Sequence, residues 1–510
     1  MIKFFKELIT DDESSEIVVN GQNVILDGGT GTGKSSWVID VLSKHSNRIL
    51  YLVPRQKLKE DITQDISVKH ISNISVITYQ SIEYYIQKKF YSDYDMAEDA
   101  IIGKWLCMYD AVVFDEIHCI VTDSSYNQYT EYIYKLMFRL LQTEIAVIMM
   151  SATGDAVFNN IKDIYVNPDH VYSIISDYSY LYCTPVKSSS TGINNTIKEL
   201  INTSTPEEKI IYFCSNKSRG IDYYYEFQQI CDTTFACSKF DETERATKIN
   251  KINSITDTFP GKLLISTTAL DVGINLKDTN IRYIVTDMYD VDSIIQCLGR
   301  RRVKPKSERN GEGDPVYFYF RNWNKNDIQF IKRNIDKELH QIDLFKNDID
   351  KFNSTFFKKD TEKSKFIYYD KNRWKLNDVG EIKLMSDSHK VHEIATYTLK
   401  NILGSRLIGA KIYEVEDYEE KHETIRSFVL SKLNVPLDAA ERESLIDVID
   451  LRDKRKRKQR SFKMIAAYLD EHCQVSLETE RIQNNGARET YWLIKPTEKT
   501  YDFIDKYYRR

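Results

Sequence analysis

Two short stretches of the chain carry residue types that suit phosphate chemistry, and the first is GGTGTGKS at residues 28–35. It fits the pattern G-x-x-x-x-G-K-[ST], with an apolar run before it and a helical pattern after it. Glycine permits backbone conformations in which successive N–H groups point at phosphate oxygens, and the following helix adds its positive N-terminal dipole. The stretch therefore predicts a binding site for the phosphates of a nucleotide.

Within this loop the side chains have separate predicted tasks. Lys34 is expected to reach the β- and γ-phosphates, and Ser35 is expected to hold Mg²⁺. The other residues expected to line the nucleotide are Gly28, Gly29, Thr30, Gly31, Thr32, Gly33 and Ser36. The alternative is a glycine turn without chemistry, which the flanking strand and helix patterns disfavour.

The second stretch is YDAVVFDEIH, in which an apolar run ends in Asp115 and Glu116. Both carboxylates then stand at the C-terminal end of a buried strand, the edge at which open α/β sheets bind ligands. Asp115 is predicted to bind Mg²⁺ through water, and Glu116 to orient and deprotonate an attacking water. The alternative is an acidic turn that merely ends a strand.

The elements that position these residues follow a repeating pattern. From residue 24 to about 150, apolar β-branched runs alternate with helix-like stretches, and a second alternation extends from 209 to 322. Apolar strands separated by helices indicate parallel sheets buried on both faces. The sequence thus predicts two consecutive α/β lobes, with a seam in the polar stretch at 185–200. The predicted strands lie in NVILD, NRILYLVP, ISVITY, YDAVVFDE, IAVIMMSAT, KIIYFCS, KLLISTT, IRYIVTD and PVYFYF.

The last third of the chain has a different character. It is polar after residue 325 and largely helical, and a basic run at 453–463 precedes an amphipathic helix and an Asn485-Gly486 hairpin signal. We predict domains at 1–185, 186–328 and 329–510. A winged-helix-like helix and hairpin at 452–510 is a candidate nucleic-acid-binding module. The alternative is a solvated charged helix start beside an ordinary core tryptophan, Trp492.

The composition of the chain limits its domain number, its partners and its cellular location. At 510 residues, two to four domains of roughly 100–200 residues are expected. The net charge of -5 gives no overall basic field, so a nucleic-acid surface must be local. None of the eight cysteines forms a C-x-x-C pair, which favours free thiols in a reducing compartment over disulfides or zinc. Without a signal peptide or an apolar run of about 18 residues, a cytoplasmic protein without membrane spans is expected.

Over residues 24–305 the chain resembles superfamily 2 helicases of the DEAD/DEAH type. Eight strings match the motifs of that family in order: GGTGTGKS, LVPRQKL, ITYQSI, DEIH, MMSAT, IIYFCSNKS, STTALDVGINL and QCLGRRR. The resemblance implies two tandem RecA-like lobes that bind ATP and Mg²⁺ between them. A metabolic kinase can have the same glycine loop, but it does not need a second lobe that carries the last two motifs. The presence of these motifs therefore argues against a metabolic kinase.

The resemblance also implies residue roles. His118, Ser151 and Thr153 would couple hydrolysis to movement between the lobes. Asp271 and Gly273 would face both ATP and the strand, and Gln296, Arg300 and Arg302 would reach across the cleft to ATP as catalytic groups. The implied contacts with a nucleic-acid backbone are Arg55, Thr78, Tyr79, Gln80, Thr267 and Thr268.

The last motif departs from the common form Q-x-x-G-R-x-G-R. Residues 296–302 fit the shorter form Q-x-x-G-R-x-R, which resembles herpesvirus origin-binding-type helicases and phage or mobile-element helicases. An arginine from the opposite lobe would stabilise charge on the transferred phosphoryl group. Arg302 is the favoured candidate for this arginine, the arginine finger, and Arg300 is the second candidate. Arg301 is expected to be a solvated surface charge.

The motif that reads adenine in DEAD-box RNA helicases does not precede the glycine loop. Phe4 or Phe5 is a candidate for stacking on the base, although the core of an amphipathic helix is the favoured place for both. This difference, with the DEIH string and the wording of STTALDVGINL, argues against the strict DEAD-box RNA helicases.

The predicted function is therefore an ATP-driven DNA helicase or translocase that serves phage or mobile-element replication or recombination, with replication proteins as partners. An RNA helicase and an ATP-gated origin-binding initiator remain alternatives. Stimulation of ATP hydrolysis by DNA or by RNA separates the first two, and salt-resistant preference for one sequence would indicate the initiator.

Overall fold

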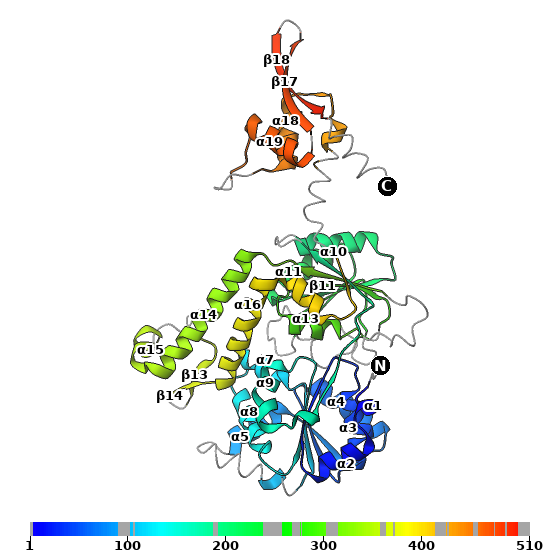
Figure 1. Ribbon diagram of the computed structural model, residues 1–510, viewed down its shortest axis with the longest axis vertical. Coiled ribbons are helices and arrows are strands. Elements are labelled where there is room, and N and C mark those ends of the chain that lie inside the picture. Colours follow the sequence, from blue (N-terminus) through cyan, green and yellow to red (C-terminus); the bar gives the residue numbers. More distant parts are fainter. Residues whose placement is uncertain are drawn as a thin grey trace. The chain divides into compact units, whose positions relative to one another are not determined.

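The computed structural model describes most of the chain in two compact units, Met1–Tyr413 and Glu414–Arg510 (Figure 1). The described residues are 4–89, 103–105, 108–186, 192–237, 258–267, 276, 278–301, 315–356, 364–370, 373–413, 425, 428–451, 457–473, 475–484 and 487–497. Within the first unit, two parallel sheets confirm the predicted pair of RecA-like α/β lobes.

The first lobe is built on a six-stranded parallel sheet with the order β3-β2-β4-β5-β1-β6. All residues of β2, β4 and β5 are buried, as expected for apolar runs covered on both faces by helices. Five of its strands coincide with predicted runs, and β6 was not predicted. The strands are β1 (Asn23–Gly28), β2 (Ile49–Val53), β3 (Ile74–Thr78), β4 (Ala111–Asp115), β5 (Ala146–Ser151) and β6 (Val171–Ile174).

Helices cover both faces of this sheet and enclose two separate hydrophobic clusters. They are α1 (Phe5–Leu8), α2 (Asp11–Val19), α3 (Lys34–Asp40), α4 (Gln56–Val68), α5 (Tyr79–Lys89), α7 (His118–Thr122), α8 (Thr130–Leu140) and α9 (Asp155–Tyr165), with short 3₁₀ turns η1 (Leu42–Lys44), η2 (Asp123–Ser125) and η3 (Pro168–His170). The parallel register sets Asp27 beside Ser151 and Asp115 beside Met150. The carboxyl ends of β1, β4 and β5 therefore meet at one edge, which gathers the predicted motifs.

The second lobe has a seven-stranded parallel sheet with the order β15-β7-β12-β11-β8-β10-β9. Four strands match predicted runs, whereas β7, β9 and β15 were not predicted. Because β7 begins at Leu181, the second sheet starts before the predicted seam. The strands are β7 (Leu181–Val186), β8 (Lys209–Phe213), β9 (Thr233–Ala236), β10 (Leu263–Ser266), β11 (Ile281–Thr286), β12 (Val316–Arg321) and β15 (Lys411–Ile412).

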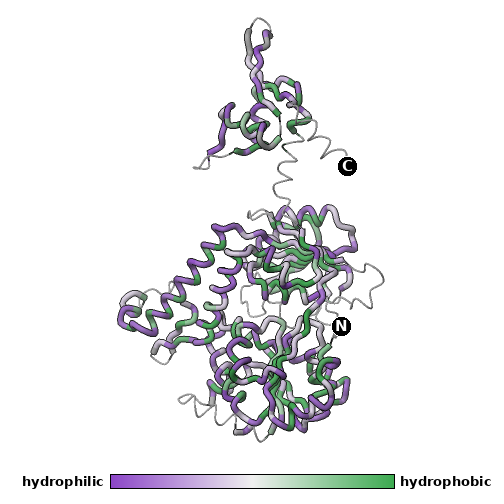
Figure 2. Tube along the Cα trace, in the orientation of Figure 1, coloured by the Kyte–Doolittle hydropathy of each residue, from purple (hydrophilic) through white to green (hydrophobic). Residues whose placement is uncertain are grey.

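Three described helices pack on this second sheet: α10 (Gly192–Thr203), α11 (Lys217–Phe227) and α13 (Val291–Leu298). One hydrophobic cluster lies beneath α10 and α11, and another lies beneath α13. Figure 2 shows hydrophobic residues concentrated along the strands of both lobes.

Residues 325–413 form an accessory segment of the first unit. It comprises α14 (Lys325–Asn347), α15 (Ile349–Phe356), the hairpin β13 (Ile367–Asp370) and β14 (Arg373–Leu376), and α16 (Asp378–Arg406). Its chain then returns to the second sheet as β15, which pairs with β7. Most buried hydrophobic side chains of this segment belong to the same cluster as the core beneath α13, whereas Val379 belongs to a cluster of the first lobe. The accessory segment is thus folded onto the second lobe, and does not belong with 414–510 as the prediction had it.

The second unit contains a three-stranded antiparallel sheet and two described helices. Its elements are β16 (Pro436–Leu437), α18 (Ala439–Ile449), α19 (Phe462–Cys473), β17 (Val475–Asn484) and β18 (Ala487–Pro496). Pairing of β17 with β18 extends to Asn484 and Ala487, which confirms the predicted hairpin after a helix. Trp492 is buried with its ring 5.3 Å from that of Phe462, so it is a core residue of this unit.

Two basic residues of the run at 453–463 are paired with acidic residues of α18. Lys458 lies 2.5 Å from Asp447, and Arg460 lies 2.7 Å from Glu443. These pairs reduce the positive field that the described part of the run presents. Over the ranges that the structure describes, no helix is long and apolar enough to cross a membrane.

Candidate functional site

The glycine loop connects β1 to α3 in the predicted way. Gly31 and Gly33 have φ values of 86° and 80°, in the left-handed region that favours glycine, and Gly33 is the N-cap of α3. The hydroxyl of Thr32 donates to the Gly29 carbonyl at 2.8 Å, which closes the turn. The loop therefore has the tight backbone and the helix N-terminus that a phosphate site requires.

Lys34 is the cation of this site, and it is buried at the start of α3. Its ammonium donates to the carbonyl of Gly28 and, at 3.2 Å, to that of Gly29. Ser35 is half-buried and Ser36 is exposed on the next positions of the helix. The charge of Lys34 thus lies over the loop where phosphate oxygens would be bound.

Asp115 ends β4 next to the loop, with 3% of its surface exposed. Tyr51 donates from its hydroxyl to Asp115 Oδ2 at 2.8 Å and is also hydrogen-bonded to Ser35. Burial, and then the charge of Glu116, raises the pKa of Asp115 to about 7. A carboxylate and a hydroxyl on either side of one phenol fit a Mg²⁺ ion that takes its remaining ligands from phosphate and water.

Tyr51 was missed in the sequence, because a tyrosine in the middle of an apolar strand reads as core. It is fully buried, and only the parallel register of β2 and β4 brings its hydroxyl to Asp115. Among the described residues, no group of three or more His, Cys, Asp or Glu side chains is arranged to hold a metal ion.

Glu116 has a left-handed backbone with φ of 50°, unusual for a residue with a side chain. Its Oε2 lies 3.4 Å from Nδ1 of His118, and that nitrogen lies 2.9 Å from Oγ of Ser151. Burial lowers the pKa of His118, so the neutral imidazole is favoured. The DEIH string and the motif at the end of β5 are thus in direct contact.

This contact continues across the two lobes. The Thr153 backbone N–H donates to Ser151 Oγ at 3.0 Å, and the Thr153 hydroxyl accepts from Nε2 of Gln296 at 3.0 Å. Gln296 lies on α13 of the second lobe, and its Oε1 accepts from Arg300 Nη2 at 3.1 Å. One chain of polar contacts therefore runs from Glu116 to Arg300.

A second contact joins the glycine loop to the end of α13. The Thr30 hydroxyl donates to the carbonyl of Gly299 at 3.3 Å. A Cβ at position 299 would lie 2.1 Å from Thr30 Oγ1, so any side chain larger than hydrogen would push the two lobes apart there. The glycine of the last motif is thus explained by the close approach of the opposite lobe.

The arginines of the last motif differ from the prediction in one respect. Arg300 and Arg301 are each 4% exposed, and Arg301 donates to the Thr279 carbonyl at 3.4 Å. Arg301 is therefore a buried residue of the second lobe, and its prediction as a solvated charge was wrong. Four predicted site residues lie outside the described residues: Thr268, Asp271, Gly273 and Arg302.

The predicted nucleic-acid contacts separate into exposed and buried residues. Gln80 is exposed at the start of α5, and Thr267 is half-buried after β10. Tyr79 is 2% exposed and donates to the Asp115 carbonyl at 2.7 Å. Thr78 is also buried, and its hydroxyl caps α5 through the backbone N–H of Ser81. The side chains of Thr78 and Tyr79 therefore support the fold and the site, and their contact with nucleic acid stays a prediction.

Arg55 is likewise turned toward the protein. Its guanidinium makes a two-pronged ion pair with the buried Asp123, at 2.7 Å from Nη2 to Oδ1, and also donates to Tyr126. The guanidinium is thus engaged within the protein, and its contact with a nucleic-acid backbone stays a prediction. The sequence could not reveal this pairing, since 68 residues separate the two partners.

Next to this pair, Glu83 is expected to control a pH dependence of stability. Burial raises its pKa to about 7, although Asn127 donates to its carboxylate at 2.8 Å. Because the folded state keeps this proton to about pH 7 and the unfolded chain releases it near 4.5, stability falls as pH rises through this interval. E83Q should be more stable than wild type above pH 7, by about 1–3 kcal/mol, with the difference vanishing near pH 4.5. Urea unfolding of both proteins at pH 5 and pH 8 measures this, and equal pH dependence would contradict it.

The two N-terminal phenylalanines have different places. Phe5 is fully buried, as predicted, and its backbone N–H donates to the Thr32 carbonyl at 3.1 Å. Phe4 is half-buried, and its ring lies beside Gly33, 3.4 Å from where a Cβ would be. Both rings therefore flank the glycine loop, Phe5 beside Gly28 and the less buried Phe4 beside Gly33.

Two protein-family models match the chain and together span just over half of it. The DEAD/DEAH box helicase model matches residues 11–161, and the helicase conserved C-terminal domain matches residues 192–303. These ranges contain strands β1 to β5 of the first sheet, strands β8 to β11 of the second, and the residues of the polar chain from Glu116 to Arg300. The chain belongs to the superfamily 2 helicases, with a DEAD/DEAH box domain followed by a helicase C-terminal domain, and is an ATP-dependent enzyme of that class.

No curated protein sequence matches the chain significantly. Among solved structures, Saccharomyces cerevisiae Dbp5 bound to RNA and ADP BeF3 is 14% identical, with a TM-score of 0.41, over 65% of this chain and 92% of that one. Mycobacterium smegmatis helicase Lhr bound to ssDNA and AMP-PNP is 13% identical, with a TM-score of 0.36, over 64% and 47%. The Escherichia coli DEAH/RHA helicase HrpB is 13% identical, with a TM-score of 0.40, over 94% and 64%. Similarity at this level does not separate one substrate from another.

Proposed function

We propose that this enzyme hydrolyses ATP in the cleft between its two lobes and uses the resulting movement to translocate on single-stranded nucleic acid. The observation that carries this proposal is the polar chain from Glu116 and His118 through Thr153 to Gln296 and Arg300. It joins the carboxylate that would handle the attacking water to the motif of the opposite lobe. A change at the phosphate would therefore alter the contact between the lobes.

Within this proposal the first lobe binds the nucleotide. The loop at 28–35 holds the phosphates, Lys34 neutralises them, and Ser35 and Asp115 hold Mg²⁺, which would polarise the phosphate oxygens. The register of the sheet supports this assignment, because it sets the loop, Asp115 and Ser151 at one edge. Glu116 accepts the proton of the attacking water.

The second lobe supplies the arginine. Arg300 is buried, is held by Gln296 and lies one residue from the Gly299 contact with the loop. We assign the finger to Arg300, and Arg302 remains the alternative. Asp271 and Gly273 are proposed to face ATP and the strand, while Gln80, Thr267 and Thr268 are proposed to touch the nucleic-acid backbone.

DNA is the proposed nucleic acid on which the enzyme translocates, in replication or recombination of a phage or mobile element. Support comes from the sequence: the short form of the last motif and the missing adenine-reading motif of DEAD-box RNA helicases. The test is the rate of ATP hydrolysis with equal nucleotide concentrations of single-stranded DNA and of RNA of the same sequence. Greater stimulation by DNA is expected, greater stimulation by RNA would make this an RNA helicase, and no stimulation by either would end the translocase proposal.

The second unit is proposed to add nucleic-acid contacts that unwinding needs. A chain that ends at Tyr413 keeps both sheets and their cores, so it should keep basal ATP hydrolysis and lose unwinding of forked DNA. The boundary is set at 413 because residues before 452 share a core with the helix and hairpin. Phosphate release and strand separation measured side by side test this, and full unwinding by the shortened chain would exclude the role.

A further inference from the structure

The accessory segment is anchored in the first lobe as well as in the second. Asn377 Nδ2 donates to the Asn127 carbonyl at 3.2 Å and to Thr130 Oγ1 at 3.1 Å, and both acceptors belong to the first lobe. Val379, at the start of α16, is fully buried in the hydrophobic cluster of that lobe. Tyr368 adds a hydrogen bond to Glu131 at 3.4 Å. The N-terminal end of α16 is therefore fixed against α7 and α8, and α7 begins at the DEIH histidine.

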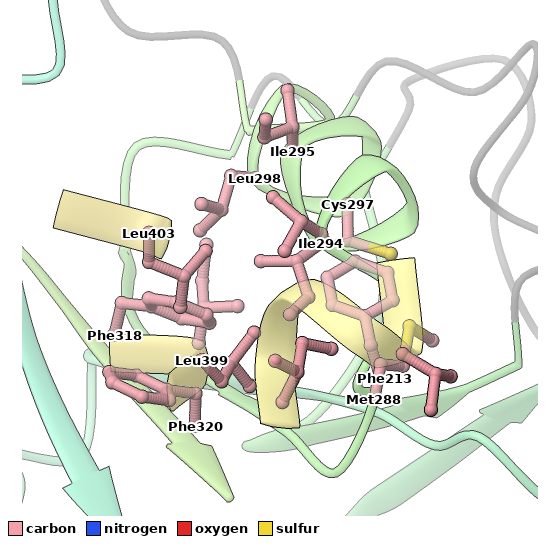
Figure 3. Close-up of a cluster of buried hydrophobic side chains, with 14 of the residues drawn as sticks. Phe213, Met288, Ile294, Ile295, Cys297, Leu298, Phe318, Phe320, Leu399 and Leu403 are labelled. Atoms are coloured by element: carbon pink, nitrogen blue, oxygen red, sulfur yellow. The ribbon is translucent and has the colours of Figure 1, made fainter. Parts of the chain in front are cut away.

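The other end of α16 packs on the helix that carries the last motif. Leu399 and Leu403 belong to the same buried cluster as Ile294 and Leu298 of α13 (Figure 3). A kink with φ of 64° at Thr398 precedes this part of the helix. One helix thus touches the DEIH region of the first lobe and α13 of the second.

Between these two ends, Lys390 of α16 holds the N-terminus of α13. Its ammonium lies 2.7 Å from Asp290 Oδ1 and 2.7 Å from Asp292 Oδ2. Asp290 is the N-cap of α13 and accepts from the backbone N–H of Ser293 at 3.1 Å. Arg406, at the end of α16, lies 3.2 Å from Asp292 and 3.7 Å from Asp155, the first residue of α9 in the first lobe.

Lys390 is the residue that links the two acidic side chains at the start of α13. Asp290 and Asp292 are two like charges at one helix start, and Lys390 is the cation that contacts both. Removal of the lysine would take away the cation that ties the start of α13 to α16 and would leave two carboxylates close together, so α16 would no longer hold α13 in this position. Gln296 and Arg300 lie on or just after α13, so such a movement would shift their side chains.

We infer that Lys390 is a positioning residue for the last motif, through which the accessory segment sets how α13 meets Thr153 and the glycine loop. The inference rests on the proposed roles of Gln296 and Arg300. Lys390 itself touches none of the residues that would bind ATP. Its effect reaches the site through the orientation of α13.

The test compares three variants in ATP hydrolysis saturated with single-stranded DNA. K390A is expected to lower kcat about 10–100-fold with an unchanged dissociation constant for ATP, since misplacement by about 1 Å can have such effects. K390R keeps the charge and should recover most of the rate. K346A is the matched control, because Lys346 is also a lysine paired with an acidic residue of α16, Glu381, but does not touch α13. K346A should hydrolyse ATP at the wild-type rate.

Double variants separate positioning from general destabilisation. Residues that act through one unit are not additive, so Q296A/K390A should be no slower than Q296A alone. If K390A does not fold, D290N/D292N/K390M removes all three charges while asparagine can still cap α13, and it should show the same loss of kcat. Wild-type kcat in folded K390A or in the folded triple variant, or a fully additive double variant, would overturn the inference. If Q296A itself has no effect, the proposed role of the last motif fails, which is a separate result.

Discussion

E116Q is expected to bind ATP as tightly as wild type and to hydrolyse it about 10²–10⁴-fold more slowly, the usual contribution of a general base. The amide keeps the size of the side chain, and with it the 3.4 Å approach to His118, but it cannot accept a proton from water. Nucleotide affinity from fluorescence titration and kcat from phosphate release measure the two effects.

The matched variant for this result is K34A. Lys34 provides the positive charge over the loop, so K34A should lose hydrolysis together with affinity for ATP. E116Q should differ from it by keeping affinity. If E116Q hydrolysed ATP at the wild-type rate, the base would have to be another group.

R300A is expected to lower the DNA-stimulated kcat by about 10³–10⁵-fold, the range for removal of an arginine finger. Affinity for ATP should change far less, because the loop of the first lobe holds the phosphates. R300K keeps the charge but loses the planar fork that donates to Gln296, so it should remain well below wild type.

R302A, measured beside R300A, decides between the two candidates. A large loss in R300A with a small one in R302A supports the assignment to Arg300. The reverse result would move the finger to Arg302 and leave Arg300 as a residue that orients Gln296.

The parts of the fold that the sequence predicted are those with strong local patterns. The glycine loop, the DEIH carboxylates and nine apolar strands depend on residues close together in the chain, and all were predicted. The strands β6, β7, β9 and β15 were not predicted. Three of them, β6, β9 and β15, have four residues or fewer, and β7 (LYCTPV) contains threonine and proline, so none is a long apolar run. That residues 325–413 lie in the first unit was also not predictable, because this segment packs on residues far away in the chain.

The places of the motif residues at the sheet edge were predictable from the sequence, whereas side-chain contacts with distant partners were not. Arg55 and Tyr79 stand where the family contacts nucleic acid, and their side chains bind Asp123 and the Asp115 carbonyl. A single sequence gives no indication of the contacts made by Tyr51, Asn377 and Lys390. Each is a single polar residue whose partner lies at least 64 residues away in the chain.

The backbone of Glu116 suggests how selection has acted on this enzyme. A residue with a side chain in the left-handed region lowers the stability of the native state by about 1–3 kcal/mol. Glycine at position 116 would relieve that strain but would remove the carboxylate that is proposed to accept a proton from water. Under the proposed mechanism, the chain tolerates this strain where a carboxylate is needed beside the phosphate, and selection for heat resistance alone should favour glycine at position 116.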